Sequence, residues 1–214
     1  MDEETTIINS NTKNQKIKDF FLKNKNKLII VFSLIILIIV SYFTIEEFKL
    51  RNKIKLANQY NKIIINFNSG QINKAVKELT DIVNKQDLTY SPLALYFLID
   101  NKLIQDKEKI NVLFDELINQ TNLEKEIKNL VIYKKALYNS EFINENDLMI
   151  ILNPIINSES IWKAHSLYLM AEYFYSKNET QKAKEFFQMI AQLKNINSEI
   201  SSNVQKRLNR DLSE

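Results

Sequence analysis

Histidine and cysteine, the residue types that most often bind metals or act as nucleophiles in enzymes, are almost missing from this chain. Its 214 residues contain one histidine, His165, and no cysteine. A zinc site needs three or four protein ligands, and His165 with the carboxylate of Glu172 does not make such a set. Without cysteine the chain has no disulfide bond, thiolate nucleophile or zinc-thiolate centre. The composition therefore predicts that no metal ion is bound.

Glycine is as scarce as histidine, since Gly70 is the only one in the chain. One glycine cannot build a glycine-rich phosphate-binding loop, and no serine lies between two glycines as a strand–turn–helix nucleophile requires. The carboxylate pair Glu124 and Glu126 fits a solvated helix face better than an acid–base pair. We expect neither a cofactor nor enzymatic activity; an enzyme with an unrecognised site is the less favoured alternative.

One set of polar and aromatic side chains near the C-terminal end has a regular spacing. Intervals of 3, 4 and 3 residues place the set in a single stripe along a helix expected over residues 161–176. Tyrosine suits protein recognition because it is amphipathic and loses little rotamer entropy when it binds. We interpret the stripe as a partner-binding face; the alternative is that its side chains contact a neighbouring helix, such as the C-terminal one. The stripe consists of His165, Tyr168, Glu172 and Tyr175.

The charge balance argues against a nucleic-acid partner. The net charge is only +3, and after residue 45 the basic and acidic side chains nearly cancel. No basic stripe with interleaved aromatic residues stands out, so contacts to a phosphate backbone have little support. We expect protein partners, and neither a nucleic acid nor a small-molecule substrate.

An apolar run of 18 residues, from Leu28 to Ile45, precedes the part of the chain that carries the stripe. As a helix it would be roughly 27 Å long, which matches the hydrocarbon thickness of a bilayer. A buried core helix of this length would show a polar face, and a cleavable signal peptide would have a shorter run with a small-x-small exit. The run therefore predicts an uncleaved transmembrane helix over residues 28–45, preceded by a largely disordered tail over residues 1–27.

The flanks of this run predict its orientation. Six lysines lie in the fifteen residues before it, whereas three lysines and one arginine lie in the fifteen residues after it. Because Lys and Arg are retained on the cytoplasmic side of a membrane, we expect the N-terminus in the cytoplasm and residues 46–214 outside it.

The remainder of the chain has the composition of an all-α protein. One glycine and two prolines are too few for the tight turns of β-sheets, and apolar residues recur at helical spacing. They predict one helix continuing from the apolar run to Phe67, and then helices over residues 71–85, 91–104, 109–120, 123–138, 147–156, 161–177, 180–193 and 199–212, with Pro154 ending the fifth of these.

Paired as hairpins, these helices have a period in the mid-thirties. The second helices begin at intervals of about 36, 38 and 35 residues, which is typical of a tetratricopeptide-type solenoid. A bundle of fifteen-residue helices would give a similar spacing, so the side chains must decide between the two. The second helices begin near Ile72, Glu108, Asn146 and Gln181.

The fourth hairpin matches the tetratricopeptide pattern best. Small residues at Ala171 and Ala183 would let its two helices approach closely, with aromatic residues filling the gap beside them. Asn178 stands where the pattern has glycine in the turn, and asparagine tolerates the left-handed conformation. The two middle hairpins lack alanine at the crossing positions, so the chain resembles a degenerate tetratricopeptide protein, in which first-helix positions such as those of the stripe line a concave binding surface. The matching residues are Leu167, Met170, Ala171, Phe174, Ala183 and Phe187 in the fourth hairpin, and Gly70, Ile72, Ala75 and Leu79 in the first.

Tail, span and degenerate repeat domain together resemble the YfgM-like family, most closely over residues 160–193. The resemblance implies a bitopic protein of the bacterial inner membrane, with a cytoplasmic N-terminus and a periplasmic domain over residues 46–214. It also implies an ancillary, chaperone-like role at the Sec translocon, with translocon subunits, periplasmic chaperones or exported clients as partners. An envelope scaffold for cell division or outer-membrane assembly is the main alternative.

Overall fold

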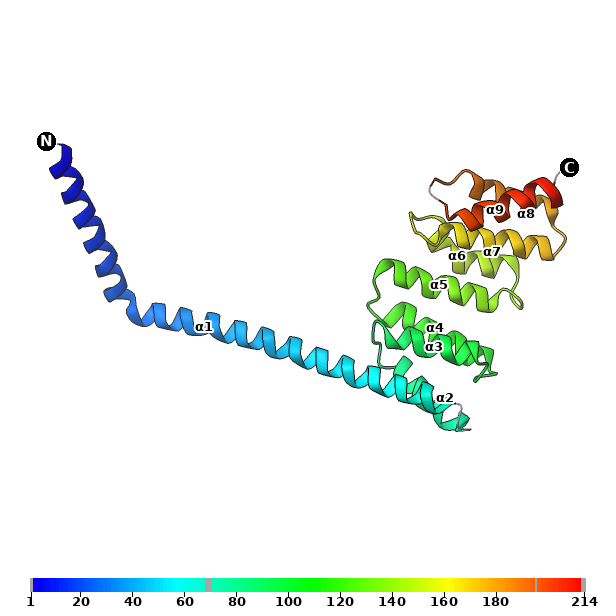
Figure 1. Ribbon diagram of the computed structural model, residues 1–214, viewed down its shortest axis with the longest axis horizontal. Coiled ribbons are helices and arrows are strands. Elements are labelled where there is room, and N and C mark those ends of the chain that lie inside the picture. Colours follow the sequence, from blue (N-terminus) through cyan, green and yellow to red (C-terminus); the bar gives the residue numbers. More distant parts are fainter. Residues whose placement is uncertain (1, 68–70, 195, 213–214) are drawn as a thin grey trace. The chain divides into compact units, whose positions relative to one another are not determined.

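The computed structural model describes residues 2–67, 71–194 and 196–212. Within these ranges every regular element is a helix and no strand occurs, so the all-α prediction is confirmed (Figure 1). The chain divides into two compact units, residues 1–55 and residues 56–214.

The first helix, α1, extends from Asp2 to Phe67 and supplies the whole described part of the first unit. It includes residues 2–27, for which the polar composition predicted a largely disordered tail. Neither glycine nor proline occurs before Gly70, so nothing in the sequence interrupts the helical hydrogen bonding. The side chains over residues 28–45 are almost all exposed. Among the described residues, α1 is the one helix long and apolar enough, by length and composition, to cross a membrane.

After the apolar run, α1 pairs some of its own charges. The Lys49 ammonium lies 3.3 Å from the Glu46 carboxylate, and the Arg51 guanidinium lies 2.7 Å from the Glu47 carboxylate. Both pairs are exposed and span about one helical turn, so each stabilises the helix only slightly, by about 0.3–0.5 kcal/mol. Their main consequence is that half of the basic residues in this flank already have an acidic partner.

In the second unit, the helices follow one another in chain order and pack side by side as a stack (Figure 1). Each helix packs chiefly against its neighbours in the sequence, and α7 and α8 share the most extensive contact. All the segments of this unit that the sequence predicted as helices are helical. They are α2 (Ile72–Val83), α3 (Tyr90–Asp100), α4 (Lys107–Gln120), α5 (Lys125–Asn139), α6 (Glu145–Ile156), α7 (Lys163–Ser176), α8 (Thr180–Ala191) and α9 (Ser198–Lys206), followed by the π-helical turn η1 (Arg207–Asp211).

Short polar side chains cap the start of several of these helices. The Asp106 carboxylate accepts hydrogen bonds from the backbone N–H groups of Glu108 and Lys109, at 3.0 and 3.2 Å. Asn144 and Asn197 cap α6 and α9 in the same way. Each such cap satisfies N–H groups that have no partner inside the helix and typically contributes about 1 kcal/mol.

Two turn predictions have different outcomes. Asn178 has a φ angle of 62°, so the left-handed conformation expected between α7 and α8 is confirmed. Pro154 does not end its helix as predicted, because α6 continues to Ile156. So close to the C-terminal end, a proline removes only one N–H donor, and the N–H of Asn157 still bonds to the carbonyl of Asn153 at 3.0 Å.

The buried residues of the second unit occupy the same relative positions in each hairpin, an arrangement that we call a constant register. Fully or almost fully buried side chains of the second helices recur at intervals of 35, 38 and 35 residues, and the same intervals relate buried residues of the first helices. The unit is therefore built from four consecutive hairpins with one internal register: the end of α1 with α2, α3 with α4, α5 with α6, and α7 with α8. The first-helix series is Ile63, Leu98, Ala136 and Ala171; the second-helix series are Ala75, Ile110, Leu148 and Ala183, then Leu79, Phe114, Leu152 and Phe187, then Ile82, Leu117, Ile155 and Ile190.

Small residues explain why α7 and α8 share the most extensive contact. Ala171 and Ala183 are both fully buried, in agreement with the predicted close approach. In the third hairpin, Ala136 occupies the position of Ala171 and is also fully buried, so the statement that the middle hairpins lack alanine there was wrong for α5. Its counterpart on α6 is Leu148, a larger residue, and the two helices of that hairpin meet less extensively.

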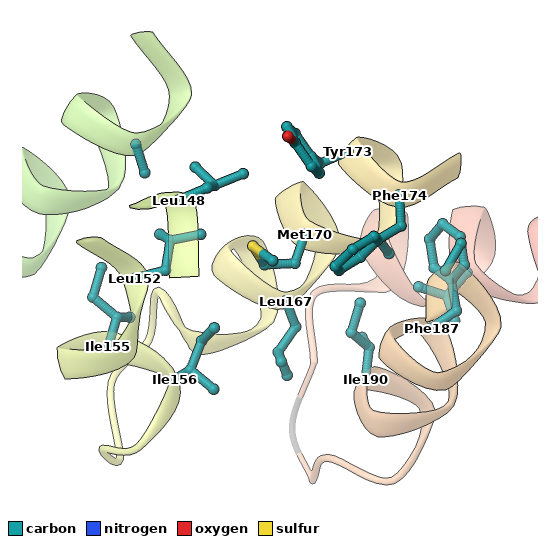
Figure 2. Close-up of a cluster of buried hydrophobic side chains, with 14 of the residues drawn as sticks. Leu148, Leu152, Ile155, Ile156, Leu167, Met170, Tyr173, Phe174, Phe187 and Ile190 are labelled. Carbon is teal, nitrogen blue, oxygen red and sulfur yellow. The ribbon is translucent and has the colours of Figure 1, made fainter. Parts of the chain in front are cut away.

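Two clusters of buried side chains form the interior of the second unit. One contains residues from the range 56–131 and the other residues from the range 132–212, while Ile118 on α4 packs against both. Figure 2 shows the second cluster, in which side chains from α6, α7 and α8 meet. Within it, the Tyr173 hydroxyl donates a hydrogen bond to the carbonyl of Ile143 at 3.0 Å. The buried side chains therefore form clusters between neighbouring hairpins and not one central core that all the helices surround.

Candidate protein-binding surface

The predicted stripe lies on α7 beside the face that this helix turns to the core. Leu167, Met170 and Ala171 on the core face are fully buried, and Figure 2 shows the first two among side chains from α6 and α8. His165, Tyr168, Glu172 and Tyr175 are all half-buried. The stripe therefore adjoins the core without belonging to its interior.

Three of the four stripe residues gather around Arg207 at the C-terminal end of the unit. Its guanidinium donates two hydrogen bonds to the Glu172 carboxylate, at 2.9 and 2.8 Å, and stacks over the Tyr175 ring at 4.4 Å. A bidentate pair of this kind fixes orientation as well as distance. Burial raises the pKa of the Tyr168 phenol, and the Glu172 carboxylate raises this pKa further, whereas Arg207 lowers it.

Tyr168 also supports the core from the side. Its ring meets the fully buried ring of Phe187 edge to face, with centroids 5.6 Å apart. Such aromatic pairs contribute about 0.5–1.5 kcal/mol beyond the area that they bury. Tyr168 therefore contributes to the stability of the fourth hairpin in addition to facing Arg207.

The fourth stripe residue, His165, belongs to a separate aromatic group. Its ring lies 5.1 Å from Trp162 and 5.9 Å from Tyr133, and these two rings stack on each other at 5.8 Å. Its Nδ1 atom is buried and has no hydrogen-bond partner among the described residues. The stripe thus divides into an aromatic end against α5 and a charged end against the C-terminal segment.

Hydrogen bonds to Glu126 hold Trp162 in this position. The Trp162 indole N–H donates to the Glu126 carbonyl at 3.1 Å, and the Ser160 hydroxyl donates to the Glu126 carboxylate at 2.7 Å. Asn129 donates to the Ser160 oxygen at 3.0 Å. Glu126, expected with Glu124 to form a solvated helix face, is instead half-buried and ties the loop before α7 to α5, while Glu124 is exposed.

The sequence analysis missed Trp162, Tyr133 and Arg207. For Tyr133 a signal was present, because it precedes Tyr168 by 35 residues, the interval that relates Ala136 to Ala171. Tyr60 occupies the same position in the first hairpin, and burial raises the pKa of all three tyrosines. Three of the four hairpins therefore carry a half-buried tyrosine at one and the same position.

All four stripe residues contact other helices of the same chain, which is the alternative to partner binding that the sequence left open. Partner binding by the exposed edges of these side chains stays a prediction. No Asp or Glu is buried among the residues whose exposure the structure describes, and the described residues contain no group of three or more His, Asp or Glu side chains that could hold a metal ion.

Comparisons with models of protein families, with curated proteins and with solved structures found no match to this chain.

Proposed function

We propose that this chain is a single-pass membrane protein whose second unit binds other proteins and catalyses no reaction. The observation that carries the proposal is the constant register of buried residues through four consecutive hairpins, because a tetratricopeptide-like solenoid has this organisation. In such a solenoid the first helices together line a concave surface that receives a partner. Here these helices would be the end of α1, α3, α5 and α7.

The tyrosine that recurs in three hairpins supports a recognition surface along these first helices. Tyr60, Tyr133 and Tyr168 are neither fully buried nor fully exposed, so each keeps part of its ring available to a partner. Tyrosine is enriched at protein interfaces because its ring supplies apolar area and its hydroxyl can form a hydrogen bond.

The proposed topology places the N-terminus in the cytoplasm and residues 46–214 in the periplasm of a bacterial cell. Six basic residues lie in the fifteen positions before the apolar run and four in the fifteen positions after it. Lys and Arg govern orientation, and their excess on the N-terminal side supports retention of that side in the cytoplasm.

The resemblance to the YfgM-like family supports a more specific role, that of an ancillary, chaperone-like subunit at the Sec translocon. Its partners would be translocon subunits, periplasmic chaperones or exported clients. The span would keep the recognition surface next to the membrane, where exported chains emerge.

Cross-linking in intact membranes, followed by purification of the full-length chain in mild detergent, tests this proposal. We expect translocon subunits to be recovered with the full-length chain and not with a variant that ends at residue 55. Recovery of cell-division or outer-membrane assembly proteins instead would replace the translocon with an envelope scaffold. If both chains recover the same proteins, the second unit does not bind partners and the proposal is wrong.

A further inference from the structure

The part of α1 immediately before the apolar run carries an unusual excess of unpaired positive charge. This juxtamembrane segment, residues 16–27, contains five lysines and one acidic residue, Asp19, which gives it a net charge of +4. All five lysine side chains are exposed, and none has an acidic partner among the described residues. They are Lys16, Lys18, Lys23, Lys25 and Lys27.

The opposite flank of the apolar run differs in this respect. Of the four basic residues at positions 49 to 55, two already pair with Glu46 and Glu47 on the same helix. Anionic lipids would therefore be attracted mainly to the juxtamembrane segment.

An apolar hollow lies on α1 next to these lysines. It is open, has a volume of about 660 Å³, and is lined by side chains between residues 21 and 35, including Phe21, Leu28 and Phe32. Lys25 is the only charged residue in its lining. Cationic and apolar side chains thus lie together within about four turns of one helix.

We propose that this region binds an anionic phospholipid, with its phosphate beside Lys25 at the hollow and one acyl chain in the hollow, while Lys23 and Lys27 add to the positive potential around the helix. The inference rests on the proposed span, which brings residues 21–27 to headgroup depth. A zwitterionic lipid would fill the hollow but offers the lysines no net negative charge, and a free phosphate would satisfy the lysines but leave the hollow empty. A lysine close to an anionic membrane surface typically strengthens binding roughly fivefold.

A lipid competition with the full-length chain tests this inference. The chain in non-ionic detergent is offered equal amounts of phosphatidylglycerol and phosphatidylcholine with identical acyl chains, and bound lipids are counted by native mass spectrometry. We expect phosphatidylglycerol to be retained about tenfold or more over phosphatidylcholine, since three lysines contribute. The variant Lys23→Gln/Lys25→Gln/Lys27→Gln should lose this preference.

A matched variant removes the same charge from the other flank. Lys49→Gln/Lys53→Gln/Lys55→Gln should keep the preference for phosphatidylglycerol; an equal loss in both triple variants would mean that only net charge matters and would overturn the site. Equal retention of the two lipids by the wild type would overturn it as well. Displacement of the lipid by excess glycerol phosphate, which has the phosphate but no acyl chain, would show a phosphate site instead. Release of the full-length chain by an alkaline wash of membranes would refute the span itself, and the lipid site with it.

Discussion

The substitution Ala183→Leu tests the internal register of the hairpins most directly. Ala183 is fully buried on α8, Ala171 is fully buried on α7, which packs against α8, and Phe187 is buried one turn further along α8. Leucine adds three carbon atoms at a point where the two helices leave no room, so side chains must leave their preferred rotamers or the backbones must separate. Overpacking of this kind costs about 1–3 kcal/mol. In a unit of this size, each kcal/mol lowers the melting temperature by about 2–4 °C.

The assay is thermal and urea unfolding of residues 56–214, followed by circular dichroism. Ala191→Leu is the matched control, because it makes the same substitution on the same helix at an exposed position and should change the free energy of unfolding by less than about 0.5 kcal/mol. The reverse change at the equivalent position of the third hairpin, Leu148→Ala, should leave a cavity and cost about 2–5 kcal/mol.

The reasoning would be refuted if Ala183→Leu and Ala191→Leu had the same small effect. The crossing of α7 and α8 would then have room for a large side chain, and the small size of Ala183 would not explain the extensive contact between the two helices.

Further predictions concern the topology, the titration of a buried tyrosine and the stripe. An alkaline phosphatase fused to the C-terminus should be active, whereas a fluorescent protein fused at the same position should be dark because it is exported through Sec. The opposite pair of results would mean that the topology is reversed. The Tyr96 hydroxyl is buried with no partner among the described residues, and burial raises the pKa of this phenol above its ordinary 10.0. The neutral phenol therefore stabilises the fold fully below pH 10, and this contribution falls as the pH rises above 10. In urea unfolding above pH 10, the Tyr96→Phe variant should lose less stability than the wild type. At neutral pH the substitution should leave the free energy of unfolding unchanged or raise it by up to about 1 kcal/mol. A double-mutant cycle of Glu172→Gln and Arg207→Gln, measured by urea unfolding, should give a coupling energy of about 1–2 kcal/mol, which lies between the values for exposed and buried ion pairs. A coupling energy near zero would mean that this pair does not hold the C-terminal segment in place. Tyr168→Ala/Tyr175→Ala should weaken partner cross-linking by about 2 kcal/mol or more if these rings are hot spots, whereas the phenylalanine variants keep the rings and separate lost contacts from lost stability.

The helices could be predicted from the sequence because their apolar residues follow a helical period and polar breaks separate them. Ala171 and Ala183 also predicted close packing of α7 against α8, since small residues at a crossing permit close approach, and these two helices share the most extensive contact. Residues 2–27, for which the polar composition predicted a largely disordered tail, are helical in the structure, and no glycine or proline interrupts them. The position of Pro154 was also misjudged, because its effect depends on how near the helix end it lies, and that end is determined by packing.

The stripe lies beside the core face of α7, as its spacing predicted, but the neighbours of its side chains could not be predicted. The Glu172 carboxylate meets a guanidinium 35 residues away, and nothing local in the sequence indicates which of several basic residues will reach it. Trp162 depends on Glu126 and Ser160 in the same way, through hydrogen bonds between hairpins. Helical periodicity reports which side of a helix is apolar, and it carries no information on the partners of the polar side.

The division of the core into two clusters has a consequence for how the chain would be delivered across a membrane. The buried residues of the first cluster all lie between positions 56 and 131, and Tyr138 packs against them, so most of this cluster can form before the rest of the chain is available. Domains generally begin to fold from the segment that emerges first. With the proposed topology, two hairpins would be folded on the far side while the rest of the chain was still threading through. Because a folded half is too wide to move back through a narrow channel, folding of the first cluster would make translocation of the chain irreversible.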